Sequence, residues 1–181
     1  MKHLLITGDP GVGKTTLVKK IIENLSKSSI LFDGFITEEV RNHSFHRTGF
    51  EVRLLKSNDV AVLADNNKKQ SSDQGVKQLG PYTVYVANFE QLTLQLISFF
   101  ENGILIIDEI GKMELFSKKF EQCVETAFKK KNIRILATVP VRGPPFVAAL
   151  KRDNGCQLFT VTRENRDSLV NEISRLLISS S

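Results

Sequence analysis

Near its start the chain carries the pattern G-x-x-x-x-G-K-T over residues 8–15, which is typical of a loop that cradles phosphate groups. Glycines let the backbone curl so that successive N–H groups point inward at an anion. We expect Lys14 to reach the terminal phosphates of a nucleotide and the Thr15 hydroxyl to bind Mg²⁺. The predicted phosphate-binding residues are Gly8, Asp9, Pro10, Gly11, Val12, Gly13, Lys14, Thr15 and Thr16.

Two acidic residues, Asp108 and Glu109, directly follow the apolar run 104–107. A strand this apolar is buried on both faces of a sheet, so acids at its carboxyl end are not there for packing. We expect Asp108 to hold the Mg²⁺ through water, and Glu109 to orient or deprotonate an attacking water. Glu114 competes with Glu109 for that role, but an acid at the start of a helix is already explained by the helix dipole.

A third group of polar residues ends the expected strand 33–41. In a parallel sheet, ligands bind beyond the carboxyl ends of the strands. Four residues are therefore candidates for facing the γ-phosphate or the attacking water: Thr37, Glu38, Glu39 and Arg41. A solvated strand end that carries charges is the equally weighted alternative.

These groups need a scaffold that brings the ends of several strands together. Short apolar or alternating runs predict strands, and apolar residues at helical spacing follow most of them. The expected strands are residues 3–7, 33–41, 49–55, 60–63, 81–86, 104–107, 133–137 and 158–161. Alternation of strand and helix predicts an α/β fold, a three-layer domain with a mostly parallel sheet.

Residues from about 46 to 87 interrupt this alternation, because their short strands follow one another without helices. We interpret them as a small antiparallel β insertion at one edge of the main sheet. The polar stretch of about 65–77 inside it predicts a mobile loop. With 181 residues, we expect a single domain spanning 1–181.

Several classes of protein share a phosphate loop, so the remaining residues must decide between them. Residues 108–111 match the D-x-x-G of GTPase switches, but the guanine-reading N-K-x-D is absent. A small-molecule or nucleotide kinase is the second alternative. Asp108 and Glu109 together favour hydrolysis, in which water, and not the hydroxyl of an acceptor, attacks the γ-phosphorus. A nucleotide-binding adaptor with little hydrolysis is the third.

Six blocks of sequence together resemble one family, the cancer-related nucleoside-triphosphatases, which includes small thermophilic nucleoside-triphosphate phosphatases. The blocks are residues 8–16, 33–41, 47–52, 107–116, 138–140 and 161–166. The resemblance runs from the first strand to the last helix and is weakest in residues 56–80. It implies a P-loop NTPase with a RecA-like core, and Mg²⁺-dependent hydrolysis of ATP, GTP and other nucleoside triphosphates to the diphosphate, with loose base selectivity.

The resemblance also implies roles for two further residues. In a RecA-like sheet the strand that ends at Thr138 inserts between the acidic strand and the phosphate-loop strand, so Thr138 joins Lys14 and Glu109 as a catalytic residue that senses the γ-phosphate. The last strand flanks the first on its other side, which brings Arg163 near the base or ribose. Asp9 departs from expectation, because a carboxylate beside a triphosphate is repulsive unless it points away.

Composition and charge pattern give no sign of a nucleic-acid, membrane or zinc partner. The formal net charge is +5, but no stripe of arginines interleaved with exposed aromatics is present, so we expect no nucleic-acid partner. No apolar run approaches the roughly 20 residues of a membrane span, and a signal peptide is not expected because the first strand begins almost at Met1. The two cysteines and three histidines lack the spacing of a zinc site. We expect an intracellular, cytoplasmic monomer.

The sequence does not single out the arginine that would neutralise charge in the transition state. An arginine that neutralises charge in the transition state is worth on the order of 10³–10⁵ in rate. Five arginines are candidates for it: Arg41, Arg47, Arg142, Arg163 and Arg166. Since none stands out, we expect turnover by the isolated protein to be slow.

Overall fold

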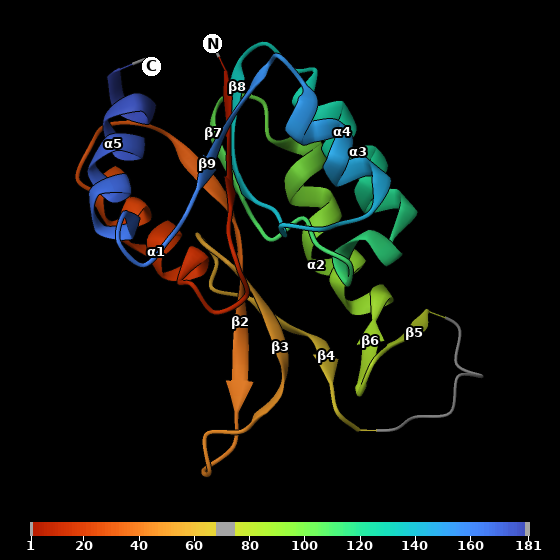
Figure 1. The fold of residues 1–181 in the computed structure, drawn as a ribbon. Coiled ribbons are helices and arrows are strands. Elements are labelled where there is room, and N and C mark those ends of the chain that lie inside the picture. The colour runs from red at the N-terminus through yellow and green to blue at the C-terminus, as the bar shows by residue number, and fades with distance from the viewer. Residues whose placement is uncertain (1, 68–74, 180–181) are drawn as a thin grey trace.

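The computed structural model describes residues 2–67 and 75–179. Their strands are β1 (His3–Thr7), β2 (Phe32–Arg41), β3 (Arg47–Leu54), β4 (Val60–Asp65), β5 (Val76–Leu79), β6 (Tyr82–Tyr85), β7 (Gly103–Asp108), β8 (Ile133–Thr138) and β9 (Cys156–Thr160). They form one sheet of nine strands in the order β5-β6-β4-β3-β2-β7-β8-β1-β9 (Figure 1).

One half of this sheet is parallel and carries the phosphate loop. Along the order β2-β7-β8-β1-β9, each strand runs parallel to the next. β8 lies between the acidic strand β7 and the phosphate-loop strand β1, and β9 flanks β1 on its other side. This is the strand order that the family resemblance implies.

The other half is antiparallel, so the prediction of a mostly parallel sheet is wrong. β2 pairs with β3, β3 with β4, β4 with β6 and β6 with β5, all antiparallel. The inserted strands extend the main sheet because the edge of β2 away from β7 offers free backbone groups to β3. Residues 68–74 of the predicted loop lie outside the described residues, while Val76 and Lys77, predicted to be part of it, belong to β5.

Helices cover both faces of the sheet and complete three layers (Figure 1). On one face lie α1 (Lys14–Leu25) and α5 (Arg166–Ser179), and on the other lie α2 (Val86–Phe99), α3 (Lys118–Phe128) and α4 (Pro145–Arg152), with a 3₁₀ turn over Glu114–Phe116 before α3. α2 begins two residues before the predicted cap Asn88, and its first turn buries Val86 and Phe89. None of the described helices is both long and apolar enough to cross a membrane.

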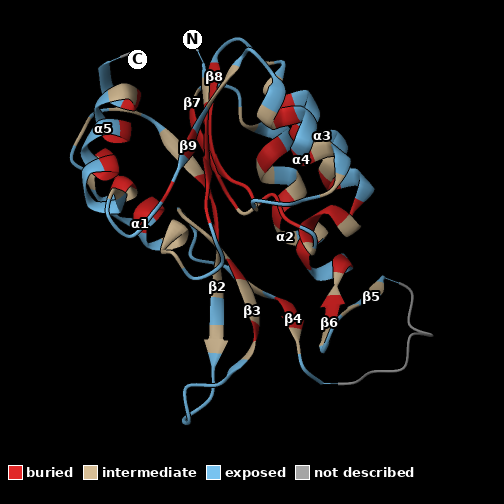
Figure 2. Cartoon of the chain, viewed as in Figure 1, coloured by how far each residue is buried: buried red, intermediate tan, exposed pale blue. Residues whose placement is uncertain are grey.

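Side chains of the central strands alternate between two hydrophobic cores. In β7, Ile104 and Ile106 pack toward α1 and α5, while Leu105 and Ile107 pack toward α2 and α3. All six residues of β8 are buried, and Figure 2 shows the buried residues concentrated on the strands between the two helical layers. This double burial explains the continuous apolar runs in the sequence and holds the ends of β7, β8 and β1 in fixed positions.

Candidate active site

The phosphate-binding pattern forms the turn between β1 and α1. Gly11 and Gly13 have φ of 76° and 107°, a left-handed conformation that side chains other than glycine adopt at a cost. A Cβ on Gly8 would lie 2.8 Å from the carbonyl oxygen of Val161, so a larger residue does not fit there. The Lys14 ammonium donates to the carbonyl oxygen of Gly8 at 3.0 Å, which holds the side chain over the loop.

A cavity of about 650 Å³ opens in front of this loop. The carboxyl ends of β2 and β7, the segment after Asp108 and the turn after β8 form its other walls, with Phe50 and Leu63 from the antiparallel strands. Its lining residues are Gly8, Pro10, Gly11, Gly13, Lys14, Thr15, Thr16, Lys19, Thr37, Glu38, Glu39, Arg41, Arg47, Phe50, Leu63, Asp108, Glu109, Lys112, Met113, Glu114, Pro140, Val141 and Arg142. The structure thus brings the phosphate loop, the two acids and the polar end of β2 together.

Asp108 has the surroundings of a cation ligand. Its side chain is 1% exposed, and burial raises the pKa of its carboxyl group, although Thr138, Thr15 and Lys14 oppose that shift. Oδ1 accepts a hydrogen bond from the Thr138 hydroxyl. Oδ2 is buried and has no hydrogen-bond partner among the described residues. A cation would satisfy this oxygen, so Asp108 and Thr15 fit a bound Mg²⁺.

Glu109 and Glu114 lie beside each other around Gly111. A Cβ on Gly111 would lie 2.8 Å from Glu109 Oε1 and 2.9 Å from Glu114 Oε2. The Gly111 N–H donates to Glu114 Oε2 at 3.1 Å. Burial and the neighbouring Glu109 raise the pKa of Glu114 to about 8, and burial also raises the pKa of Glu109, where Lys14 acts in the opposite direction. Glu114 therefore keeps its proton near neutral pH, whereas Lys14 favours the ionised form of Glu109.

Some predicted site residues stand apart from the cavity wall. Asp9, Val12, Thr138 and Arg163 are not among the described residues that line it. Thr138 is fully buried, and its hydroxyl contacts Asp108, so it lies behind the acid and not at the surface of the cavity. Within residues 2–67 and 75–179, no three histidine, cysteine or acidic residues cluster as a metal site of the protein's own.

Sequence reasoning missed two parts of the cavity. It treated Glu114 as an acid at a helix start, whereas Glu114 is 4% exposed and faces Glu109. It named Arg47 among five candidate arginines but did not anticipate that Phe50 would also line the cavity from β3. The sequence did carry a signal for each part. The block 107–116 contains glycine and three acidic residues, and the block 47–52 contains an arginine and a glycine at the start of a strand.

Comparison with known proteins finds relatives that match almost the whole chain. Residues 3–174 match the family described as NTPase. The chain is 41% identical to nucleoside-triphosphatase THEP1 of Aquifex aeolicus, over 96% of this chain and 98% of that protein. It is 37% identical to the human cancer-related nucleoside-triphosphatase, over 99% of this chain and 98% of the relative.

Solved structures agree with the sequence comparison. The crystal structure of THEP1 from Aquifex aeolicus superposes with a TM-score of 0.84, at 39% identity, over 98% of this chain and 99% of that one. The solution structure of the human cancer-related nucleoside triphosphatase gives a TM-score of 0.83 at 36% identity and covers both chains completely. The mixed α/β sheet is therefore shared with these proteins.

Proposed function

Since this chain belongs to the NTPase family, we propose that it hydrolyses ATP, GTP and other nucleoside triphosphates to the diphosphate and phosphate, with Mg²⁺, slowly and with loose base selectivity. One observation carries the proposal. In a single cavity, Lys14 of the phosphate loop faces Asp108, whose buried Oδ2 has no partner in the described chain, and Glu109, a carboxylate able to accept a proton.

Each step of the proposed hydrolysis can be assigned to a group of the protein. Backbone N–H groups of the loop and the Lys14 ammonium bind the β- and γ-phosphates and stabilise the charge that develops on them. Glu109 accepts the proton of a water whose oxygen attacks the γ-phosphorus, and the bond from that phosphorus to the β–γ bridging oxygen breaks. Asp108 and Thr15 would hold Mg²⁺, which when bound neutralises charge on the β- and γ-oxygens.

Loose base selectivity and slow turnover are the finer parts of the proposal. The sequence contains no N-K-x-D motif that would read guanine, so discrimination between bases rests on weaker contacts. P-loop GTPases that work without a partner's arginine turn over at about 10⁻² s⁻¹ or below. We therefore expect turnover well below the enzyme median of about 10 s⁻¹.

The test is a phosphate-release assay with ATP, GTP, CTP and UTP, each with Mg²⁺ and with excess chelator. We expect release from all four that differs by less than about tenfold and that stops when the chelator is added. Release that requires an added hydroxyl acceptor would replace hydrolysis by a kinase reaction. Tight nucleotide binding without release would leave an adaptor.

A further inference from the structure

The β2–β3 hairpin places a pair of arginines on the cavity wall. β2 pairs with β7 only as far as Ile36, which lies opposite Asp108, but it continues to Arg41 alongside β3. At about 3.4 Å per residue, Glu39 lies about 10 Å past the level of Asp108. In Figure 1 this hairpin extends beyond the helical layers, on the side where the parallel strands end.

Both arginines bind the same carboxylate. Arg41 donates to Glu39 Oε2 and Arg47 donates to Glu39 Oε1, and all three residues line the cavity. Their side chains are 49%, 38% and 34% exposed for Arg41, Arg47 and Glu39. An acid that holds two arginines at the wall of a phosphate site keeps them positioned before an anionic ligand arrives.

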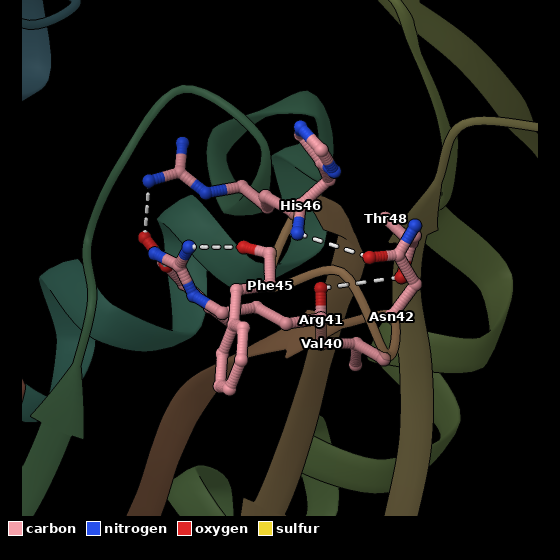
Figure 3. A network of polar contacts seen from close by, with 8 residues as sticks. Val40, Arg41, Asn42, Phe45, His46 and Thr48 are labelled. Carbon is pink, nitrogen blue, oxygen red and sulfur yellow. Dashed lines mark hydrogen bonds and ion pairs between the residues drawn. The ribbon is translucent and has the colours of Figure 1, made fainter.

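The two arginines differ in what else they hold. Arg41 also donates to the carbonyl oxygen of Phe45 at 2.8 Å, and so closes the hairpin tip (Figure 3). The tip is further held by Asn42 Oδ1, which accepts from the N–H of His46 at 3.0 Å. Arg41 therefore has a structural task. Among the described residues the Arg47 side chain has no hydrogen-bond partner besides Glu39, which leaves guanidinium donors for a ligand.

Arg47 is supported from below by an aromatic ring. Its guanidinium carbon lies 5.4 Å from the centre of the Phe50 ring, at cation–π distance. Phe50 packs in turn edge-on against Tyr82 of β6, with ring centres 5.4 Å apart. This support restricts Arg47 to the cavity wall, so little ordering remains to be done when a ligand binds.

The other candidate arginines are less suited to contact a phosphate group in this cavity. Arg163 does not line the cavity, and the guanidinium of Arg166 lies 3.7 Å from the point where a Cβ on Gly13 would stand, outside the cavity lining. Arg142 lines the cavity but is exposed, and no hydrogen bond or ion pair holds it in the part of the chain that the structure describes. A group that stabilises a transition state is most effective when it is already in place.

We propose that Arg47 is the arginine that contacts the γ-phosphate in the transition state of hydrolysis, exchanging its bond to Glu39 for phosphate oxygens. The proposal rests on the proposed function, since it names the arginine of that reaction. A planar guanidinium suits the task because it donates two parallel hydrogen bonds to one phosphate and stays charged. Arg41 keeps Glu39 and the hairpin in place when the Arg47 guanidinium moves from Glu39 to the phosphate.

The main test compares Arg47→Ala with a matched control, Arg53→Ala. Arg53 lies on the same strand, pairs with Glu38 at 3.0 Å and is 37% exposed, yet it does not line the cavity. We expect Arg47→Ala to lower kcat at least a hundredfold with KM changed less than about fivefold, and Arg53→Ala to stay within about threefold of the parent. Arg47→Gln, which keeps the reach to Glu39, serves if the alanine variant does not fold.

A binding measurement separates a transition-state contact from general attraction. We expect Arg47→Ala to bind a non-hydrolysable ATP analogue within about threefold of the parent, but to lose at least a hundredfold in affinity for ADP–fluoroaluminate, measured by calorimetry. Arg47→Lys keeps the charge without the fork, so we expect less than a tenth of the parent kcat.

Three results would overturn the proposal. The first is turnover within threefold of the parent in a folded Arg47→Ala protein. The second is an equal loss of kcat in Arg53→Ala, which would indicate that the overall positive charge of this region, and not a contact by Arg47, supports hydrolysis. The third is a loss in Arg142→Ala while Arg47→Ala stays active, which would assign the role to Arg142. Failure of the parent protein to release phosphate from any triphosphate would instead refute the proposed function itself.

Discussion

The parallel and antiparallel halves of the sheet are built differently and contribute different things to the cavity. In the parallel half, helices cover both faces, and β8 is buried along its whole length. In the antiparallel half, β4 is buried only in part: Leu63 and Ala64 are buried, whereas Val60 and Val62 are 42% and 38% exposed. The doubly covered half holds Asp108 and the phosphate loop rigidly, whereas the half-covered one presents charged side chains at the wall.

The largest effect should come from the parallel half, at Lys14. In Lys14→Ala the ammonium that contacts the terminal phosphates is lost, so both nucleotide affinity and hydrolysis should fall to background. The fold should survive, because the Lys14 side chain donates only to carbonyl oxygens of its own loop, those of Gly8 and Asp9, and belongs to neither hydrophobic core of the described chain. Phosphate release and circular dichroism test this together. Unchanged turnover in a well-folded variant would remove the loop from the active site.

The second prediction separates the two acids that face each other around Gly111. Glu109→Gln keeps the size and hydrogen-bonding reach of the side chain but cannot accept a proton, so kcat should fall by roughly 10²–10⁴. Binding of the Mg²⁺–nucleotide should be retained or tightened, because a negative charge near the triphosphate is gone. Glu114→Gln should cost less, since Glu114 is protonated near neutral pH. Full activity in Glu109→Gln with a dead Glu114→Gln would reverse the assignment.

A third prediction compares the stability of the two halves directly. Ile106 of β7 is fully buried, so Ile106→Ala should lower the free energy of unfolding by roughly 2–5 kcal/mol. Val62 of β4 is 38% exposed, so Val62→Ala should change it by less than about 1 kcal/mol. Urea denaturation measures both. Equal losses would mean that the antiparallel half is packed as tightly as the parallel one.

The last prediction is a pH dependence of stability. Folded Glu114 keeps its proton up to a pKa of about 8, whereas an unfolded glutamate loses it near 4.5. The unfolded state therefore binds fewer protons between these values, and this residue lowers the free energy of unfolding as pH rises from about 4.5 to about 8. Glu114→Gln should flatten that slope. Urea midpoints at pH 5.5 and pH 8 test it, and an identical slope in both proteins would contradict the burial of the acid.

Most of the phosphate site could be predicted from sequence because its parts are local. The strand before Gly8, the glycines, Lys14 and the helix after them lie within about 25 consecutive residues, and Asp108 and Glu109 end a visibly apolar strand. The prediction of a mostly parallel sheet failed because the antiparallel insertion was expected to be small, whereas among the described strands it makes four antiparallel pairings, one of them with β2 of the main sheet. β5 escaped notice because its four residues, Val76–Leu79, have too few apolar side chains for a pattern.

The sequence by itself determined the phosphate loop, the pair of acids and the alternation of strands with helices, since each depends on residues close together in the chain and on periods that burial imposes. Only the tertiary structure decided that Glu114 is buried against Glu109, that Thr138 lies behind Asp108, and that Arg47 shares a cavity with Lys14. Thr138 and Asp108 lie on neighbouring strands, and Arg47 and Lys14 come from β3 and α1, so these contacts depend on strand order and register, which no local pattern encodes. The burial of Glu114 depends on how the segment after β7 packs.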